Sequence, residues 1–280
     1  MRTQSRDTAE WIERRMIQGH QRFSSSQRFF RVRSLTGSMC AMRPNGTLPR
    51  AEALLMHYDL PYLDDDAAAE TPPFDIEPTL LTVTHVAASL GHPVVVTGGV
   101  ACCLYGFPRM VHDVDVLLAP TAAEALYQHL AASWIPLPPT LSTWSLIDPA
   151  TLVKVDLMTT HGRMPIEPLI ARHQPTLVTD EGEIIDVLSA EDVLLTRLAW
   201  YQEQGTQPDD QWNDLMGVVK IHAPLLDHSS LRTQAHRFTL DALLDQLLDD
   251  CDEREGTRWP RGTETIIARK VEQKPRQCQM

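Results

Sequence analysis

Residues 93–118 read PVVVTGGVACCLYGFPRMVHDVDVLL, and this stretch decides the fold. The apolar run 94–96 predicts a short buried strand, the pair Gly98-Gly99 a tight turn, and 100–105 a helix. A glycine turn before a helix leaves backbone N–H groups accessible at the positive end of the helix dipole. Such a place suits a phosphate group.

A second strand follows and carries Asp113 and Asp115 two residues apart. Residues i and i+2 of a strand point to the same face, about 7 Å apart. Val114, Val116 and Leu117 are apolar and predict that this strand lies in the core, which would hold the two acids in place. Neighbouring carboxylates repel each other unless a cation lies between them, and Mg²⁺ is commonly bound by carboxylates together with substrate phosphates. The stretch therefore supplies both halves of a metal–nucleotide site.

The ordered pattern resembles the motif of the DNA polymerase β-type nucleotidyltransferase superfamily: Gly98-Gly99-x-Ala101, Gly106, Arg109 and Asp113-x-Asp115. Within this superfamily the chain is most similar to the AbiEii-like, toxin-type bacterial nucleotidyltransferases. The resemblance covers about residues 75–252, and its specific part is confined to 97–115 and Asp156. A lone GG or DxD pair is weak evidence, whereas the ordered composite between strand signals is stronger.

The resemblance implies an α+β fold, with a mixed β-sheet flanked by helices and followed by a helical C-terminal part. It implies Mg²⁺-dependent transfer of a nucleoside monophosphate from an NTP to an acceptor hydroxyl. The acceptor could be an RNA or tRNA 3′ end, a protein, or a small molecule such as an aminoglycoside. The toxin-type relatives further imply a toxin–antitoxin or phage-defence role, with an antitoxin protein as partner.

The resemblance also assigns metal-binding and catalytic roles to three acids. Asp113 and Asp115 would bind the metal that carries the triphosphate, and Asp156 would join them in binding the metal that activates the acceptor hydroxyl. Asp156 lies in a predicted strand, 152–158, along which apolar and polar residues alternate. From the residues alone, an acid on the polar face of such a strand is normally an exposed residue.

Nucleotide-binding roles fall, by the same resemblance, on Thr97, Gly98, Gly99, Arg109 and Arg197. Arg109 would contact a phosphate or brace the strand of acids, since a guanidinium fork suits either role. Arg197 takes the place of a recurring basic residue, and Asp214 that of an acid facing the site. Without the resemblance, Arg197 and Asp214 are interpreted as ordinary charges on helix surfaces.

The sequence departs from the family pattern at two positions. Many superfamily members have Gly-Ser at the turn, where this chain has Gly98-Gly99, as the toxin-type branch does. That branch often has Thr two residues before the first Asp, where this chain has Val111. The lost hydroxyl affects the fine positioning of the site rather than metal binding.

The 280-residue chain has a net charge of −12, and the charge is unevenly distributed. Residues 1–50 contain ten Arg and three acids, a net +7, so the remainder carries −19. An acidic body argues against broad binding of nucleic-acid backbones, which requires a basic surface.

The five cysteines are scattered without a CxxC pair, which is typical of a protein in the reducing cytoplasm. The N-terminus shows no signal-peptide pattern, and the longest apolar stretch is too short to span a bilayer. We therefore expect a cytoplasmic protein with no membrane partner.

Four segments are predicted along the chain: a basic, disordered extension and linker over 1–73, a nucleotidyltransferase core over 74–188, a helical subdomain over 189–252, and a loose tail over 253–280. Residues 1–50 show little periodicity, and disorder is the favoured interpretation. Two alternatives stay open for them: a basic arm that contacts RNA, or a translation start near Met42 or Met56.

Capping signals predict where three helices begin or end: Gly91 after the helix over 80–90, Thr121 with Glu124 before 122–134, and Ser189 with Asp192 before 190–201. Strands are predicted over 141–147 and 152–158, and a hairpin over 175–179 and 184–188. Further helices are predicted over 211–221, 230–236 and 240–251.

Two other hypotheses compete with an active enzyme. One is a catalytically silent module of the same fold that binds an NTP or a partner protein. The other is an α/β domain whose DxD pair merely faces solvent.

Overall fold

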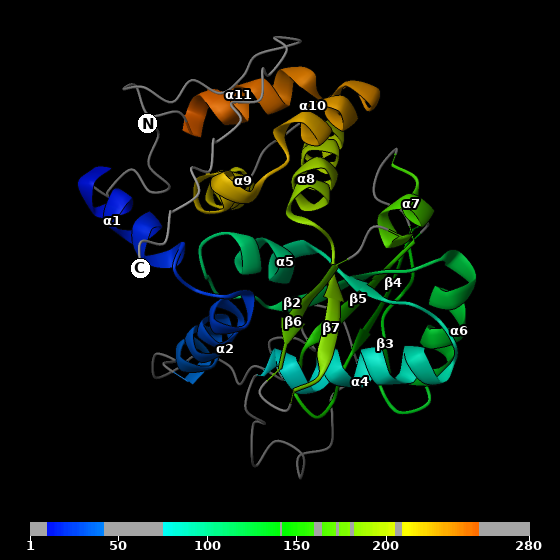
Figure 1. Cartoon of the computed structure of the whole chain (residues 1–280). Coiled ribbons are helices and arrows are strands. Elements are labelled where there is room, and N and C mark those ends of the chain that lie inside the picture. The colour runs from blue at the N-terminus through cyan, green and yellow to red at the C-terminus, as the bar shows by residue number, and fades with distance from the viewer. Residues whose placement is uncertain are drawn as a thin grey trace, which may run out of the picture.

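The computed structural model describes residues 10–41, 75–140, 142–159, 164–171, 174–179, 182–204 and 209–251. These residues form a mixed seven-stranded sheet flanked by helices. The helices that follow the last strand, α8 (Ala190–Gln204) to α11 (Asp241–Cys251), are grouped together beyond α5 (Gly98–Tyr105) (Figure 1). The predicted α+β fold class is confirmed. No helix of the described ranges is both long enough and apolar enough to cross a membrane.

The sheet has the strand order β3-β4-β5-β2-β1-β7-β6. The pairs β2–β5 and β1–β7 are parallel, and the other neighbouring pairs are antiparallel. The strands are β1 (Val95–Val96), β2 (Asp113–Leu117), β3 (Ile135–Pro136), β4 (Thr143–Ile147), β5 (Lys154–Met158), β6 (Gln174–Val178) and β7 (Ile184–Val187). The predicted strands and the hairpin are confirmed, with bounds that shift by one to a few residues.

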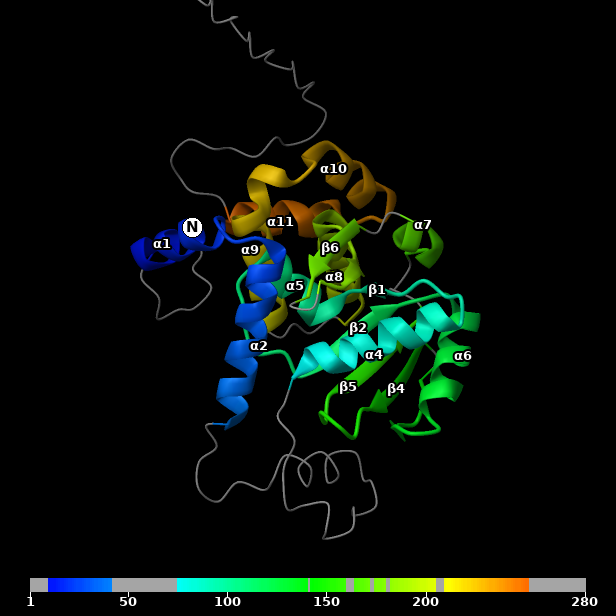
Figure 2. The same ribbon diagram turned by 60° about the horizontal axis from the view of Figure 1, so that its bottom comes forward.

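Helices cover both faces of the sheet. α4 and α6 lie across one face (Figure 2), whereas α5 and the C-terminal helices lie on the other. The helices are α1 (Glu10–His20), α2 (Ser25–Ala41), α4 (Ile76–Ser89), α5 (Gly98–Tyr105), α6 (Pro120–Leu130), α7 (Ile166–Ala171), α8 (Ala190–Gln204), α9 (Asp209–His222), α10 (His228–Arg237) and α11 (Asp241–Cys251), with a 3₁₀ turn at Ala223–Leu225.

Local capping explains two helix boundaries as the sequence predicted. Gly91 follows α4 with a φ of 76°, the left-handed conformation that glycine adopts without strain. Before α8, the Ser189 hydroxyl accepts a hydrogen bond from the Asp192 N–H at 3.1 Å, which satisfies one of the free N–H groups of the first turn.

The predicted start of α6 was wrong. Thr121 does not cap this helix, which begins at Pro120 with Ala119 as the N-cap residue and no side-chain capping bond. Proline suits the first helical position because its φ is already helical and its missing N–H would have no partner there. The helix also ends earlier than predicted, at Leu130, and Trp134 turns into the core.

The prediction of a disordered N-terminal extension was wrong for residues 10–41, which form α1 and α2. α2 packs on α5 and β6, and buries Phe29 and Val32 in the core. Its arginines find distant partners: Arg28 Nη1 donates to the Leu104 carbonyl at 2.8 Å, and Arg33 Nη2 to Asp75 Oδ2 at 2.6 Å. The predicted linker up to residue 73 and the tail from 253 lie outside the described residues.

Candidate active site

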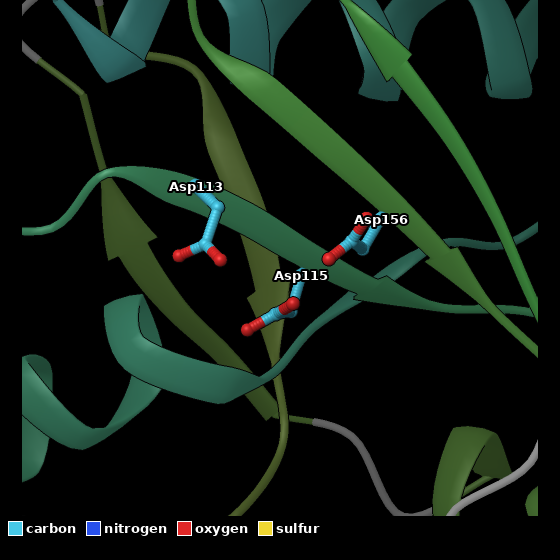
Figure 3. Close-up of side chains that lie close together, drawn as sticks. All are labelled: Asp113, Asp115 and Asp156. Atoms are coloured by element: carbon cyan, nitrogen blue, oxygen red, sulfur yellow. The ribbon is translucent and has the colours of Figure 1, made fainter. Parts of the chain in front are cut away.

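The three acids Asp113, Asp115 and Asp156 lie together on one face of the sheet (Figure 3). β2 and β5 are parallel neighbours, and their register pairs Asp115 with Asp156. One carboxylate oxygen from each acid lies within 4.8 Å of the other two. The period-two alternation of both strands causes this arrangement, because it places the apolar residues between the acids on the buried face.

Gly98 and Gly99, predicted as a turn before the helix, instead form the start of α5 itself; this glycine turn lies against Asp115. Gly98 has a φ of +65°, and a Cβ atom on it would lie only 1.7 Å from Asp115 Oδ2. The carboxylate of Asp115 thus occupies the space that any side chain at position 98 would need. It also accepts a hydrogen bond from the Gly99 N–H, so the turn and the strand of acids form one unit.

The charges in this unit are not balanced. The pKa of Asp115 is raised to about 7, first by burial of its carboxyl group and next by the neighbouring charge of Asp113. The charge of Arg197 acts in the opposite direction. An acid destabilised in this way is a site that binding of a cation would relieve.

Asp156 already has two partners that sequence reasoning missed. Lys154 Nζ donates to Asp156 Oδ2 at 2.7 Å, and the Ser145 hydroxyl donates to Oδ1 at 2.6 Å. Lys154 precedes Asp156 by two residues on the same strand face, so the alternation of this strand already contained the signal. Ser145 comes from β4, and only the pairing of β4 with β5 brings it there.

Arg109 is held by Asp214. Its Nε and Nη2 donate to the two carboxylate oxygens of Asp214, both at 2.7 Å, and its Nη1 donates to the Met110 carbonyl at 2.8 Å. This hydrogen-bonded pair raises the pKa of Arg109. Arg109 also lines the cavity, and its two predicted roles, phosphate contact and bracing of the strand of acids, both stay predictions. The interpretation of Asp214 as an ordinary surface charge was wrong, since its side chain is only 9% exposed.

Arg197 lies in the same cavity as the acids. Its Nε is buried and has no hydrogen-bond partner among the described residues. The interpretation of Arg197 as a surface charge was therefore also wrong. A guanidinium that lines the cavity beside a cluster of acids is suited to an anionic ligand.

Thr97 lies at the N-cap of α5 but does not cap it with its side chain. Its backbone N–H donates to the Asp115 carbonyl at 2.9 Å, and the residue is buried outside the lining of the cavity. Its predicted role as a hydroxyl donor stays a prediction.

At position 111, where the toxin-type branch often has Thr, the backbone makes a hydrogen bond to a residue of α2. The buried Val111 donates its backbone N–H to the hydroxyl of Thr36 on α2 at 3.2 Å. The N-terminal helix therefore contacts the segment that leads into the strand of acids.

The acids, the glycine turn and Arg197 line one cavity of about 380 Å³, a size within the range of small-molecule sites. Five further residues line it: Arg109, which the sequence predicted, and Thr143, Met158, Trp200 and Gln211, which it did not. Carboxylate oxygens are hard ligands, and three of them at this mutual distance fit Mg²⁺.

No protein-family model matches the chain, and no curated protein matches its sequence. Similar folds occur among solved structures. The antibiotic-resistance factor ANT(2″)-Ia in complex with adenylyl-2″-tobramycin is 12% identical, with a TM-score of 0.43, over 59% of this chain and 97% of its own. A nucleotidyltransferase-like protein from Paracoccidioides brasiliensis is 17% identical, with a TM-score of 0.36, over 61% and 92%. These scores are low, so the function has to be inferred from the residues of the site.

Proposed function

We propose that this protein is a Mg²⁺-dependent nucleotidyltransferase that moves a nucleoside monophosphate from an NTP to an acceptor hydroxyl. One observation carries the proposal: three carboxylates within 4.8 Å of one another lie beside a glycine turn and share a cavity with Arg197. This arrangement joins a cation site to a phosphate site.

In this proposal Asp113, Asp115 and Asp156 bind the metal. When bound, Mg²⁺ would neutralise charge on the triphosphate and lower the pKa of the acceptor hydroxyl. Gly98 and Gly99 add no side chain of their own at the N-terminus of α5, so a phosphate would approach it beside the carboxylate of Asp115, whose charge the metal would neutralise.

The remaining residues position the substrate. The acceptor hydroxyl releases its proton to solvent, its oxygen forms a bond to the α-phosphorus, and the bond from that phosphorus to the leaving pyrophosphate breaks. Arg197 lines the cavity and donates from its guanidinium to a phosphate oxygen, which stabilises negative charge there. Arg109, held by Asp214, lies beside the glycine turn, where its Nη2 would be 3.2 Å from a Cβ at Gly99.

The class of acceptor and the biological role remain to be identified by experiment. RNA or tRNA 3′ ends, protein hydroxyls and aminoglycosides are the acceptor classes to compare. A toxin of a toxin–antitoxin or phage-defence pair, with an antitoxin partner, is the role that the sequence resemblance suggests.

A second candidate is a catalytically silent NTP-binding module, and one observation favours it. Both carboxylate oxygens of Asp156 are already engaged, by Lys154 and by Ser145. While Lys154 remains bound, its positive charge would oppose the binding of a metal at Asp156.

Label transfer separates the two candidates. The protein is incubated with Mg²⁺ and each α-³²P-labelled NTP, and with total RNA, cell protein or an aminoglycoside as acceptor. We expect transfer to one acceptor class, loss of transfer with EDTA, and a loss of at least about 100-fold in Asp113→Asn. Glu124→Gln is the matched control, since this acid is exposed on α6 at the opposite face of the sheet. Binding of an NTP without transfer to any acceptor would identify the silent module.

A further inference from the structure

Two helices each present a pair of polar or aromatic residues to the cavity region. On α8, Arg197 and Trp200 are three residues apart, so they lie on the same helix face, and both line the cavity. On α9, Gln211 and Asp214 have the same spacing; Gln211 lines the cavity and Asp214 holds Arg109. α8 therefore contributes Arg197 and Trp200 to the cavity wall and α9 contributes Gln211, while Asp214 acts through Arg109.

A packed pair of aromatic rings fixes the uncharged residues in place. Tyr201 and Trp212, which follow Trp200 and Gln211 directly in the sequence, are buried with ring centroids 4.8 Å apart. Trp212 Nε1 also donates to Asp250 Oδ2 at 2.8 Å. The contact between Tyr201 and Trp212 joins α8 to α9 next to Trp200 and Gln211, so both residues are held where they line the cavity.

Neither Trp200 nor Gln211 is a fully buried core residue. Trp200 is only partly buried, unlike the core residues Tyr201 and Trp212. The Gln211 carbonyl oxygen is buried and has no hydrogen-bond partner among the described residues. A buried acceptor left unpaired is destabilising, and Gln211 lines the cavity, so a turn of its amide toward an N–H group of a bound ligand would be favoured.

We propose that Trp200 and Gln211 form a nucleobase-binding subsite of the cavity. The indole ring of Trp200 stacks on the base, and the Gln211 carbonyl oxygen accepts a hydrogen bond from an N–H group on the edge of the base. Stacking on an aromatic side chain is worth about 1–3 kcal/mol per base and tolerates every base, so discrimination between bases falls to Gln211. The subsite rests on the proposed nucleotidyltransferase function, to which it adds the residues that recognise the nucleoside.

Calorimetric titration of the full-length protein with two ligands tests the subsite. The ligands are an α,β-methylene NTP analogue, which cannot transfer its nucleotide, and inorganic tripolyphosphate, which has no base; Mg²⁺ is present with both. We expect the wild type to bind the analogue at least about tenfold more tightly than tripolyphosphate. Trp200→Ala should weaken analogue binding by about 5- to 150-fold and leave tripolyphosphate binding unchanged, as expected for the loss of about 1–3 kcal/mol of stacking.

Two further variants complete the design. Trp200→Phe keeps an aromatic face and should retain most of the affinity, while melting temperatures show whether each variant is folded. Gln211→Leu should reduce the differences in affinity among analogues of the four bases without changing tripolyphosphate binding.

Three outcomes would overturn the subsite. One is equal binding of analogue and tripolyphosphate by the wild type, and another is equal weakening of both ligands in folded Trp200→Ala. The third is an unchanged base preference in Gln211→Leu. In each case the proposed nucleotidyltransferase function would survive, whereas binding of neither ligand by the wild type would contradict that function itself.

Discussion

Lys154 and Asp156 form an ion pair on the cavity face of β5, with Lys154 Nζ 2.7 Å from Asp156 Oδ2. A positive side chain thus partly neutralises a cluster of three acids that repel one another. The same ammonium group competes with any metal for Asp156. The first prediction follows from this competition.

Replacing Lys154 by Met should raise the affinity for Mg²⁺, roughly tenfold, because the metal no longer has to displace or approach a cation. The same change should lower the free energy of unfolding of the metal-free protein by about 1–3 kcal/mol, since the pair is largely shielded from solvent. Calorimetry with MgCl₂ and urea denaturation measure the two effects. Arg232→Met is the control, because it breaks the Arg232–Asp245 pair on α10 and α11. Equal Mg²⁺ affinity in wild type and Lys154→Met would show that Lys154 does not compete with the metal.

The ion pair of Arg109 with Asp214 should behave as one energetic unit. Arg109→Lys loses the two-pronged hydrogen bonding, and Asp214→Asn loses the charge. In a double-mutant cycle by urea denaturation, we expect a coupling energy of about 0.5–3 kcal/mol between the two positions.

Tripolyphosphate binding by the same variants separates bracing from direct phosphate contact. If Arg109 only braces the glycine turn, Arg109→Lys and Asp214→Asn should weaken binding to a similar extent. A loss confined to Arg109→Lys would mean that its guanidinium contacts the phosphate itself.

Two glycines with positive φ provide a matched test of the turn. At Gly91 a Cβ would meet nothing within 4 Å, so Gly91→Ala should cost only the backbone strain, about 1–2 kcal/mol. At Gly98 the Cβ would collide with Asp115, so Gly98→Ala should displace that carboxylate and abolish Mg²⁺ binding as well. Thermal melting with and without Mg²⁺ reports both effects. A normal Mg²⁺-induced increase in melting temperature for Gly98→Ala would contradict the proposed metal site.

Neighbouring phenylalanines on α2 test whether the N-terminal helices belong to the folded core. Phe29 is 3% exposed and Phe30 is 55% exposed. Phe29→Ala should lower the free energy of unfolding by about 3–5 kcal/mol, whereas Phe30→Ala should change it by less than about 0.5 kcal/mol. Urea denaturation of the full-length chain measures both. Equal, small effects would mean that α2 is not packed on the core.

The local parts of the site could be predicted from the sequence. Alternation over a few residues places Asp113, Asp115 and Asp156 on one strand face each, and a Gly-Gly pair between an apolar run and a helix predicts the turn. The motif then places the two strands side by side. Ser189 and Gly91 mark helix ends because capping depends on the nearest few residues.

The parts that were missed depend on contacts between distant residues. Arg109 and Asp214 are 105 positions apart, and nothing local distinguishes either from a solvated charge. Arg28 and Leu104 are 76 positions apart, so an arginine-rich segment was interpreted as disordered although Arg28 donates to a core carbonyl. Trp200 and Gln211 meet at the cavity only because Tyr201 and Trp212 join their helices.

Because Asp115 lies against Gly98, position 98 can serve as an internal control in large-scale mutagenesis. In a library that replaces each residue by all nineteen others, every substitution at position 98 adds a Cβ atom that overlaps the Asp115 carboxylate, whatever the chemistry of the new side chain. All substitutions at position 98 should therefore score alike as loss of function. A screen in which their scores differ widely measures a property that does not depend on this cavity.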